Sequence, residues 1–142
     1  MGSTNHITTK WLGGMAFESN NPSGHNLRID AGPEDGGEGI GLRPKALMLS
    51  SLAGCSGLDV ASLLKKMKLE VEEFTIETIA NLTDEHPKYF DSVIIEYHFH
   101  GNNLNKNKLQ RAVDLSVEKY CGVFEMFRQF AKMETKTIFH HS

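Results

Sequence analysis

The sequence contains two cysteines, Cys55 and Cys121, and their type and placement are its most informative feature. A cysteine thiolate can open the O–O bond of a peroxide and become a sulfenic acid, which condenses with a second thiol to a disulfide. The two residues are 66 positions apart, so no local motif joins them. Only the fold can bring the two sulfurs together, which is what thiol-based redox chemistry requires.

Small residues flank both cysteines, and both are expected on helices where the sulfur stays accessible. Cys55 stands between Gly54 and Gly57 in an apolar stretch, and Cys121 precedes Gly122. A free thiol with a pKa near 8.5 is only slightly ionised at neutral pH, so its activation needs a cation, hydrogen bonds or a helix N-terminus. If Gly122 ends one helix, Cys121 lies where the next begins, and that end favours a thiolate.

The neighbours of Cys55 in the sequence do not decide its chemistry. Ser51, one helical turn before it, can donate a hydrogen bond, whereas a charged Asp59, one turn after it, opposes thiolate formation. Three cations reach the sulfur only if the fold brings them there: Arg28, Arg43 and Lys45. The alternative interpretation is that both cysteines are structural thiols that fill a core. The residue pattern leaves the two interpretations open.

Composition indicates an ordinary soluble protein and excludes several function classes. The chain has 39% apolar residues, 23% charged residues and a net charge of −3, with its basic residues scattered, so no nucleic-acid partner is expected. We find no apolar run of the length that a membrane span needs, and the N-terminus carries no signal-peptide core. A cytoplasmic location follows, where thiols are normally reduced.

Other candidate sites are weaker. His98 and His100 share one face of a predicted strand, but no third ligand is spaced to complete a metal site, and His140 with His141 is expected in a frayed end. The glycine-rich segment 32–41 lacks the ending of a phosphate-binding loop and carries three acidic residues, so a surface loop is predicted. Neither a metal nor another cofactor is expected.

The pattern of apolar residues predicts the element order β-β-β-α-β-β-α-α-β, an α+β fold of antiparallel sheets around a buried central helix. Strands are expected within 6–17, at 25–31, 71–82, 92–100 and 135–139, and helices at 44–67, 109–120 and 123–133. The first helix is apolar on nearly every side, as in a buried helix. The whole chain, 1–142, is expected to form one domain, and an intertwined dimer would cover the central helix.

Two segments together resemble the OsmC/Ohr family of organic hydroperoxide-detoxifying proteins, specifically its YhfA-like branch. The first segment runs from Pro44 to Met67 and includes Leu52-Ala53-Gly54-Cys55-Ser56-Gly57-Leu58-Asp59-Val60; the second is Glu118-Lys119-Tyr120-Cys121. The order of elements also agrees over nearly the whole chain.

The resemblance implies an intertwined α+β homodimer with two active sites at the subunit interface. Cys55 would be the peroxidatic and Cys121 the resolving cysteine of a thiol-dependent peroxidase acting in oxidative-stress defence. The substrate would be a hydrophobic organic hydroperoxide, and a thiol or dihydrolipoyl donor would be the reductant. An apolar lining would suit such a substrate: Leu52, Leu58, Phe124, Met126 and Phe127.

The chain departs from the active members of the family at two places. They carry a glutamate after the helix-opening proline, where this sequence has Lys45, and an arginine in the first hairpin, where it has Gly13-Gly14-Met15. Lys45 or Arg28 would have to supply a replacement cation. The alternatives are a non-catalytic module that binds a small apolar ligand in the dimer cleft, and a thiol redox sensor.

Overall fold

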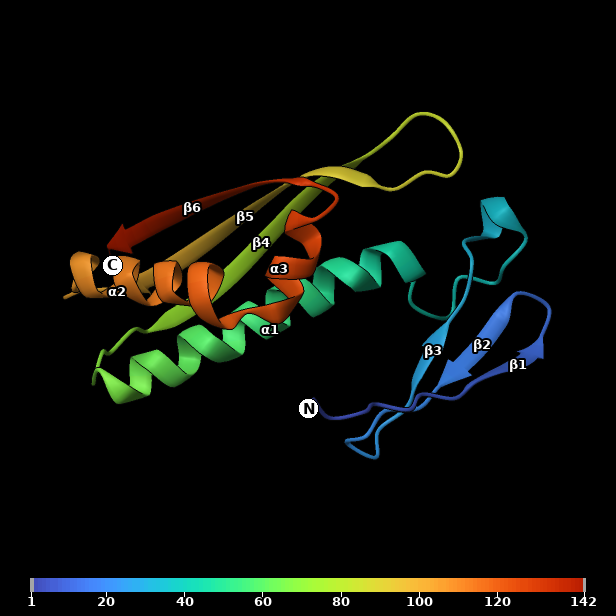
Figure 1. Ribbon diagram of the computed structural model, residues 1–142, viewed down its shortest axis with the longest axis horizontal. Helices are drawn as coiled ribbons and strands as arrows, with labels where there is room; N and C mark the ends of the chain where they lie inside the picture. The colour runs from blue at the N-terminus through green and yellow to red at the C-terminus, as the bar shows by residue number, and fades with distance from the viewer. Residues whose placement is uncertain (1, 142) are drawn as a thin grey trace. The chain divides into compact units, whose positions relative to one another are not determined.

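The structure, a computed structural model, describes residues 2–141. The chain divides into two compact units, residues 1–48 and 49–142. The elements follow one another in the predicted order β-β-β-α-β-β-α-α-β (Figure 1), with two further single turns. The α+β class is confirmed, while one domain over 1–142 stays a prediction.

The first unit contains a three-stranded antiparallel sheet, made of β1 (Thr9–Gly13), β2 (Ala16–Ser19) and β3 (Leu27–Ile29). The predicted turn between the first two strands is confirmed: Gly13 and Gly14 have φ angles of +102° and +56°, which only glycine adopts readily. A short 3₁₀ turn, η1 (Pro33–Asp35), lies in the glycine-rich loop that leads to α1 (Pro44–Lys66).

The second unit is built on a sheet of three long strands in the order β4-β5-β6: β4 (Glu73–Leu82), β5 (Phe90–Gly101) and β6 (Lys132–His141). β4 and β5 are antiparallel, but β5 and β6 are parallel, so the expectation of purely antiparallel sheets is wrong. The physical reason is the connection: helices lie between β5 and β6, and such a crossover returns the chain in the same direction.

Between β5 and β6 the chain forms α2 (Lys106–Leu115), a π-helical turn η2 (Ser116–Tyr120) and α3 (Gly122–Arg128). The predicted end of α3 near residue 133 is wrong, because the chain turns at 129–131 and β6 begins at Lys132. The expected frayed end is also wrong: His140 and His141 belong to β6, where His140 pairs with His100.

The core of the second unit lies between its sheet and its helices. Figure 1 shows α1, α2 and α3 on the same side of the sheet. Alternate residues of β5 point toward these helices and are buried: Val93, Ile95, Tyr97 and Phe99. They pack with Leu52 and Val60 of α1, Leu109, Ala112 and Val113 of α2, and Phe124 and Phe127 of α3.

Within one chain the central helix is covered along one stripe only. Only Leu52, Ser56 and Val60 of α1 are buried, which is a stripe at i, i+4 and i+8, while Leu58 is 75% exposed. Among the described residues α1 is also the one helix long and apolar enough to cross a membrane, with a mean hydropathy of 1.5 over its best window. A core helix of a soluble protein meets the same criterion, and Asp59 interrupts the apolar run.

Candidate functional site

The fold brings the two cysteines together. Cys55 lies in the middle of α1, and Cys121 lies between η2 and α3, where it caps the N-terminus of α3. Both are free thiols, Cys55 half-buried and Cys121 buried. The Cys55 side chain lies beside the Cys121 thiol, close enough to raise its pKa. Two reduced sulfurs 66 positions apart in sequence are therefore neighbours.

Cys121 lies at the start of a helix, as predicted, yet its surroundings disfavour a thiolate. Its sulfur accepts a hydrogen bond from the Phe124 N–H at 3.3 Å, which favours the ionised form. Burial opposes this and raises the pKa of Cys121 to about 11, helped by the Cys55 side chain and by the charge of Asp59. The expected stabilisation of a Cys121 thiolate is therefore wrong, because desolvation outweighs the one N–H.

A chain of buried hydroxyl groups lies beside the two thiols. The Tyr97 Oη is 2.6 Å from the Ser56 Oγ, which is 2.7 Å from the Ser116 Oγ. The Ser116 hydroxyl donates to Asp59 Oδ2 at 3.0 Å. Tyr97, Ser56 and Ser116 are completely buried, so these hydrogen bonds are shielded from water.

The cations considered from the sequence all belong to the first unit. Arg43 forms an exposed ion pair with Glu34 at 3.0 Å, and Arg28 and Lys45 are exposed. The activation of Cys55 by any of them stays a prediction. Of the apolar residues considered for a substrate, Leu52, Phe124 and Phe127 are core residues, whereas Leu58 and Met126 are 75% and 65% exposed.

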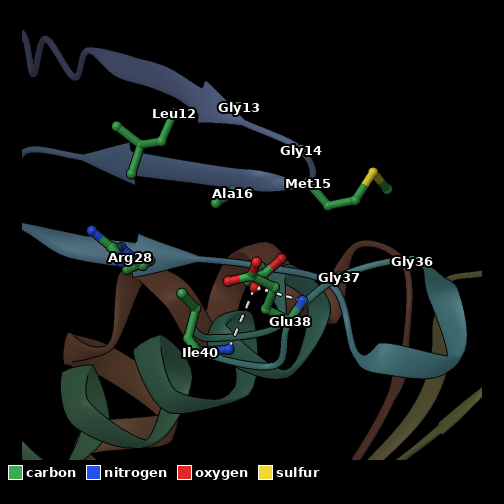
Figure 2. Close-up of a pocket in the computed structure, with 11 residues that line it drawn as sticks. Leu12, Gly13, Gly14, Met15, Ala16, Arg28, Gly36, Gly37, Glu38 and Ile40 are labelled. Carbon is green, nitrogen blue, oxygen red and sulfur yellow. Dashed lines mark hydrogen bonds between the residues drawn. The ribbon is translucent and has the colours of Figure 1, made fainter.

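The glycine-rich loop directs several of its backbone N–H groups at a carboxylate of its own. With the first hairpin the loop forms a hollow of about 400 Å³, whose lining includes Arg28 and Asp30. Figure 2 shows the side chain of Arg28 and the loop residues from Gly36 to Ile40 around this hollow. The Asp30 carboxylate accepts the N–H groups of Ala31, Glu38 and Ile40 at 2.8, 3.1 and 3.4 Å. Burial would raise the pKa of Asp30, but these backbone donors hold it below its usual value. The loop is thus folded around its own carboxylate.

The histidines form a cluster on the other face of the second sheet. His98 Nδ1 is 2.8 Å from His140 Nε2, and His98 Nε2 is 3.0 Å from Glu96 Oε1. The rings of His100 and His140 stack with centroids 4.2 Å apart. No group of three or more His, Cys, Asp or Glu side chains among the described residues is arranged to hold a metal ion.

Three members of the hydroxyl chain, Ser56, Tyr97 and Ser116, are not recognisable as site residues from the sequence alone. The available signal was the hydroxyl group itself, because a buried hydroxyl in an otherwise apolar stripe needs a hydrogen-bond partner.

The sequence and the fold are both similar to those of known proteins. Residues 36–136 match the family model described as OsmC-like protein. Protein YhfA from Escherichia coli K12 is 31% identical over 120 residues, which are 84% of this chain and 87% of YhfA. The crystal structure of a hypothetical protein from Aquifex aeolicus VF5 superposes with a TM-score of 0.86 at 26% identity, covering 99% of both chains.

An organic hydroperoxide resistance protein OsmC from Legionella pneumophila has the same fold. Its TM-score is 0.70 at 20% identity, with 96% of this chain and 97% of that chain covered. The expectation from the two cysteine-bearing segments is confirmed, since the family model spans both of them. This chain belongs to the OsmC family.

Proposed function

We propose that the protein is a thiol-dependent peroxidase that reduces organic hydroperoxides, with Cys55 as the peroxidatic and Cys121 as the resolving cysteine. The observation that carries the proposal is the contact between two free thiols contributed by distant elements. It is supported by the family and by a structural neighbour that is an organic hydroperoxide resistance protein.

The reaction has two steps. The Cys55 thiolate attacks one peroxide oxygen, the O–O bond breaks, and the products are a Cys55 sulfenic acid and, after protonation of the leaving oxygen, an alcohol. The sulfur of Cys121 then attacks the Cys55 sulfur, the S–O bond breaks, and the Cys121 proton leaves with the hydroxide as water. An external dithiol, such as a dihydrolipoyl group, reduces the resulting disulfide and is itself oxidised.

The difference in burial suits these roles. Cys55 is half-buried and therefore reachable by a substrate, whereas Cys121 is 4% exposed. Burial raises the pKa of Cys121, so at neutral pH this residue is a thiol and its proton must leave as the S–S bond forms in the second step. Exposed apolar side chains on the same helices, Leu58 and Met126, suit an organic substrate better than hydrogen peroxide.

We further propose an intertwined homodimer that forms a single domain per chain and works in the cytoplasm. The support is the uncovered apolar surface: Leu58 of α1 and Met126 of α3 are exposed in the second unit, and Trp11 is 62% exposed in the first. Sedimentation of the wild type as a dimer, and of Leu58→Arg as a monomer, would support this assembly. A monomeric wild type at micromolar concentration would refute it.

The direct test is oxidation of the reduced protein by one equivalent of cumene hydroperoxide or hydrogen peroxide, followed by mass spectrometry of non-reduced peptides. We expect a Cys55–Cys121 disulfide, formed faster with the organic peroxide. The matched variant Cys121→Ser should stop at the Cys55 sulfenic acid, and Cys55→Ser should not react. Unreacted thiols in the wild type would refute the peroxidase.

A second candidate is the non-catalytic module that binds an apolar ligand. It is favoured by Lys45, and by the hairpin tip Gly13-Gly14, which stand where active family members carry an ion pair. Unchanged binding of an apolar fluorescent probe by the Cys55→Ser, Cys121→Ser double variant, together with inert wild-type thiols, would favour it. A thiol redox sensor would instead form the disulfide without turnover.

A further inference from the structure

The hydroxyl chain has a direction that follows from counting hydrogens. A carboxylate only accepts, so the single hydroxyl proton of Ser116 is donated to Asp59. The Ser116 oxygen, 2.7 Å from Ser56, must then accept from Ser56, and the Ser56 oxygen, 2.6 Å from Tyr97, must accept from Tyr97. The hydrogen bonds therefore run from Tyr97 through Ser56 and Ser116 to Asp59.

The protonation of Tyr97 agrees with this direction. Burial raises the pKa of Tyr97 to about 12; the hydrogen bond with Ser56 counteracts this, while the charges of Cys121 and Asp59 add to it. Tyr97 thus keeps its proton at neutral pH and can serve as the first donor. With every proton assigned, each hydroxyl of the chain has a partner.

The same chain connects the two segments that carry the thiols. Ser56 follows Cys55 directly on α1, and Asp59 lies one turn later on the same helix. Both bond to the hydroxyl of Ser116, which opens η2, and the carbonyl oxygen of Ser116 accepts the N–H of Cys121 at 2.7 Å. Ser116 is therefore held by the helix of Cys55 on one side and holds the backbone of Cys121 on the other.

The backbone around Cys121 needs such support. η2 is a π-helical turn, a rare conformation that is frequently found at functional sites. At Cys121 the backbone becomes extended, with φ −79° and ψ 101°, before α3 begins. The position of the Cys121 sulfur depends on packing and on where η2 ends. The hydrogen bond from the Cys121 N–H to the Ser116 carbonyl fixes that end.

We propose that Asp59 and Ser116 are positioning residues for the thiol pair: together they hold the turn of Cys121 against the helix of Cys55 and so set how readily the two sulfurs form a disulfide. This inference deepens the proposed function and rests on it for its role in turnover. The step concerned is the attack of the Cys121 sulfur on the Cys55 sulfenic acid, with release of water. Neither Asp59 nor Ser116 exchanges electrons in it.

The test is the equilibrium between the protein dithiol and glutathione disulfide, because it needs no peroxide. In redox buffers the disulfide fraction gives the equilibrium constant for the pair. We expect Ser116→Ala and Asp59→Ala each to shift this constant at least tenfold toward the dithiol, which for two electrons is about 30 mV. Ser116→Ala leaves the charge of Asp59 in place, so a shift in both variants reports the hydrogen bond rather than the charge.

The control is Asp114→Asn. Asp114 is also a half-buried carboxylate with one side-chain hydrogen bond, from Gln110 at 3.0 Å, and it lies on α2 without a role in the hydroxyl chain. The equilibrium constant of the Asp114→Asn protein with glutathione disulfide should stay within twofold of the wild-type value. A purely structural role would weaken the reduced and the disulfide forms alike and leave the potential unchanged. Wild-type constants in both Ser116→Ala and Asp59→Ala would therefore overturn the inference.

Stopped-flow oxidation separates this inference from the proposed function. In Ser116→Ala we expect Cys55 to be oxidised by cumene hydroperoxide at the wild-type rate, while the disulfide closes at least tenfold more slowly. If the wild type does not react with hydroperoxide, the peroxidase is refuted, but the glutathione equilibrium still decides the positioning role. If Asp59→Ala does not fold, Ser116→Ala alone decides it.

Discussion

Replacing Ser56 with alanine interrupts the hydroxyl chain at its centre. We expect this change to lower the free energy of unfolding more than removal of the first donor, the hydroxyl of Tyr97. In Ser56→Ala the hydroxyl of Tyr97, which is completely buried, loses the Ser56 oxygen as its acceptor, and Ser116 loses its donor. In Tyr97→Phe the Ser56 hydroxyl still donates to Ser116, and only one hydrogen bond is lost. The direction of the hydrogen bonds thus predicts that removing the acceptor Ser56 lowers the free energy of unfolding more than removing the donor hydroxyl of Tyr97.

The magnitudes follow from the cost of an unsatisfied buried group. A buried donor without a partner costs about 1–3 kcal/mol, and a hydrogen bond lost with its donor about 1 kcal/mol. We expect Ser56→Ala to lower the free energy of unfolding by about 2–3 kcal/mol and Tyr97→Phe by about 1 kcal/mol. The double variant should cost less than the sum by about 1 kcal/mol, since it removes both partners of one hydrogen bond.

Urea unfolding of the three variants, at fixed protein concentration and with excess reductant, measures these differences. The concentration must be fixed because any dimer links stability to association. If Tyr97→Phe costs more than Ser56→Ala, the inferred direction of the hydrogen bonds is wrong. If the two costs simply add, the hydrogen bond between Ser56 and Tyr97 contributes nothing.

Three other predictions concern single residues. Alkylation of Cys121 by iodoacetamide in a Cys55→Ser protein should have its midpoint above that of a free thiol, about 8.5, because burial raises the pKa of Cys121; a midpoint at or below that value would contradict it. His140 has its pKa lowered by burial and by the neighbouring imidazoles, so the unfolded chain takes up this proton more readily. The contribution of neutral His140 to stability is therefore present above the ordinary histidine pKa and is lost as the pH falls below it. The urea midpoint of the wild type should fall more steeply between pH 7 and 5 than that of His140→Gln. Equal slopes would contradict this. Gly54→Ala should stabilise the monomeric chain by about 1 kcal/mol in thermal unfolding, because no atom beyond the neighbouring backbone of α1 lies within 4 Å of the added Cβ; loss of dimerisation in the same variant would place a second copy against Gly54.

Periodic patterns predicted the elements well, but not the connections between strands. The alternation in β4 and β5 placed both strands to within two residues, because each buries one face. Whether the last strand runs parallel or antiparallel to β5 is not encoded in its own residues. It depends on how α2, η2 and α3 return the chain, and the π-helical turn has no periodic signature.

For α1, the sequence pattern predicts more burial than a single chain provides. The pattern predicted a helix buried all round, and the structure buries one stripe, Leu52, Ser56 and Val60. Both statements are consistent if the remaining faces, including Leu58, are covered by a second copy. In the proposed dimer, the pattern would reflect burial by both copies, whereas the structure of one chain shows only the stripe that this chain covers.

The candidate site shows the opposite limit, because the sequence identified its reactive atoms but not what holds them. Cys55 and Cys121 stand out by residue type alone, since two cysteines among 142 residues are few and chemically distinct. Serine is common, and Ser116 differs from any other serine only by the partners that a long-range contact provides, 57 and 60 positions away. In the OsmC fold these partners sit on the helix of Cys55, so the residues that position the thiols become recognisable only when the two segments are seen in contact.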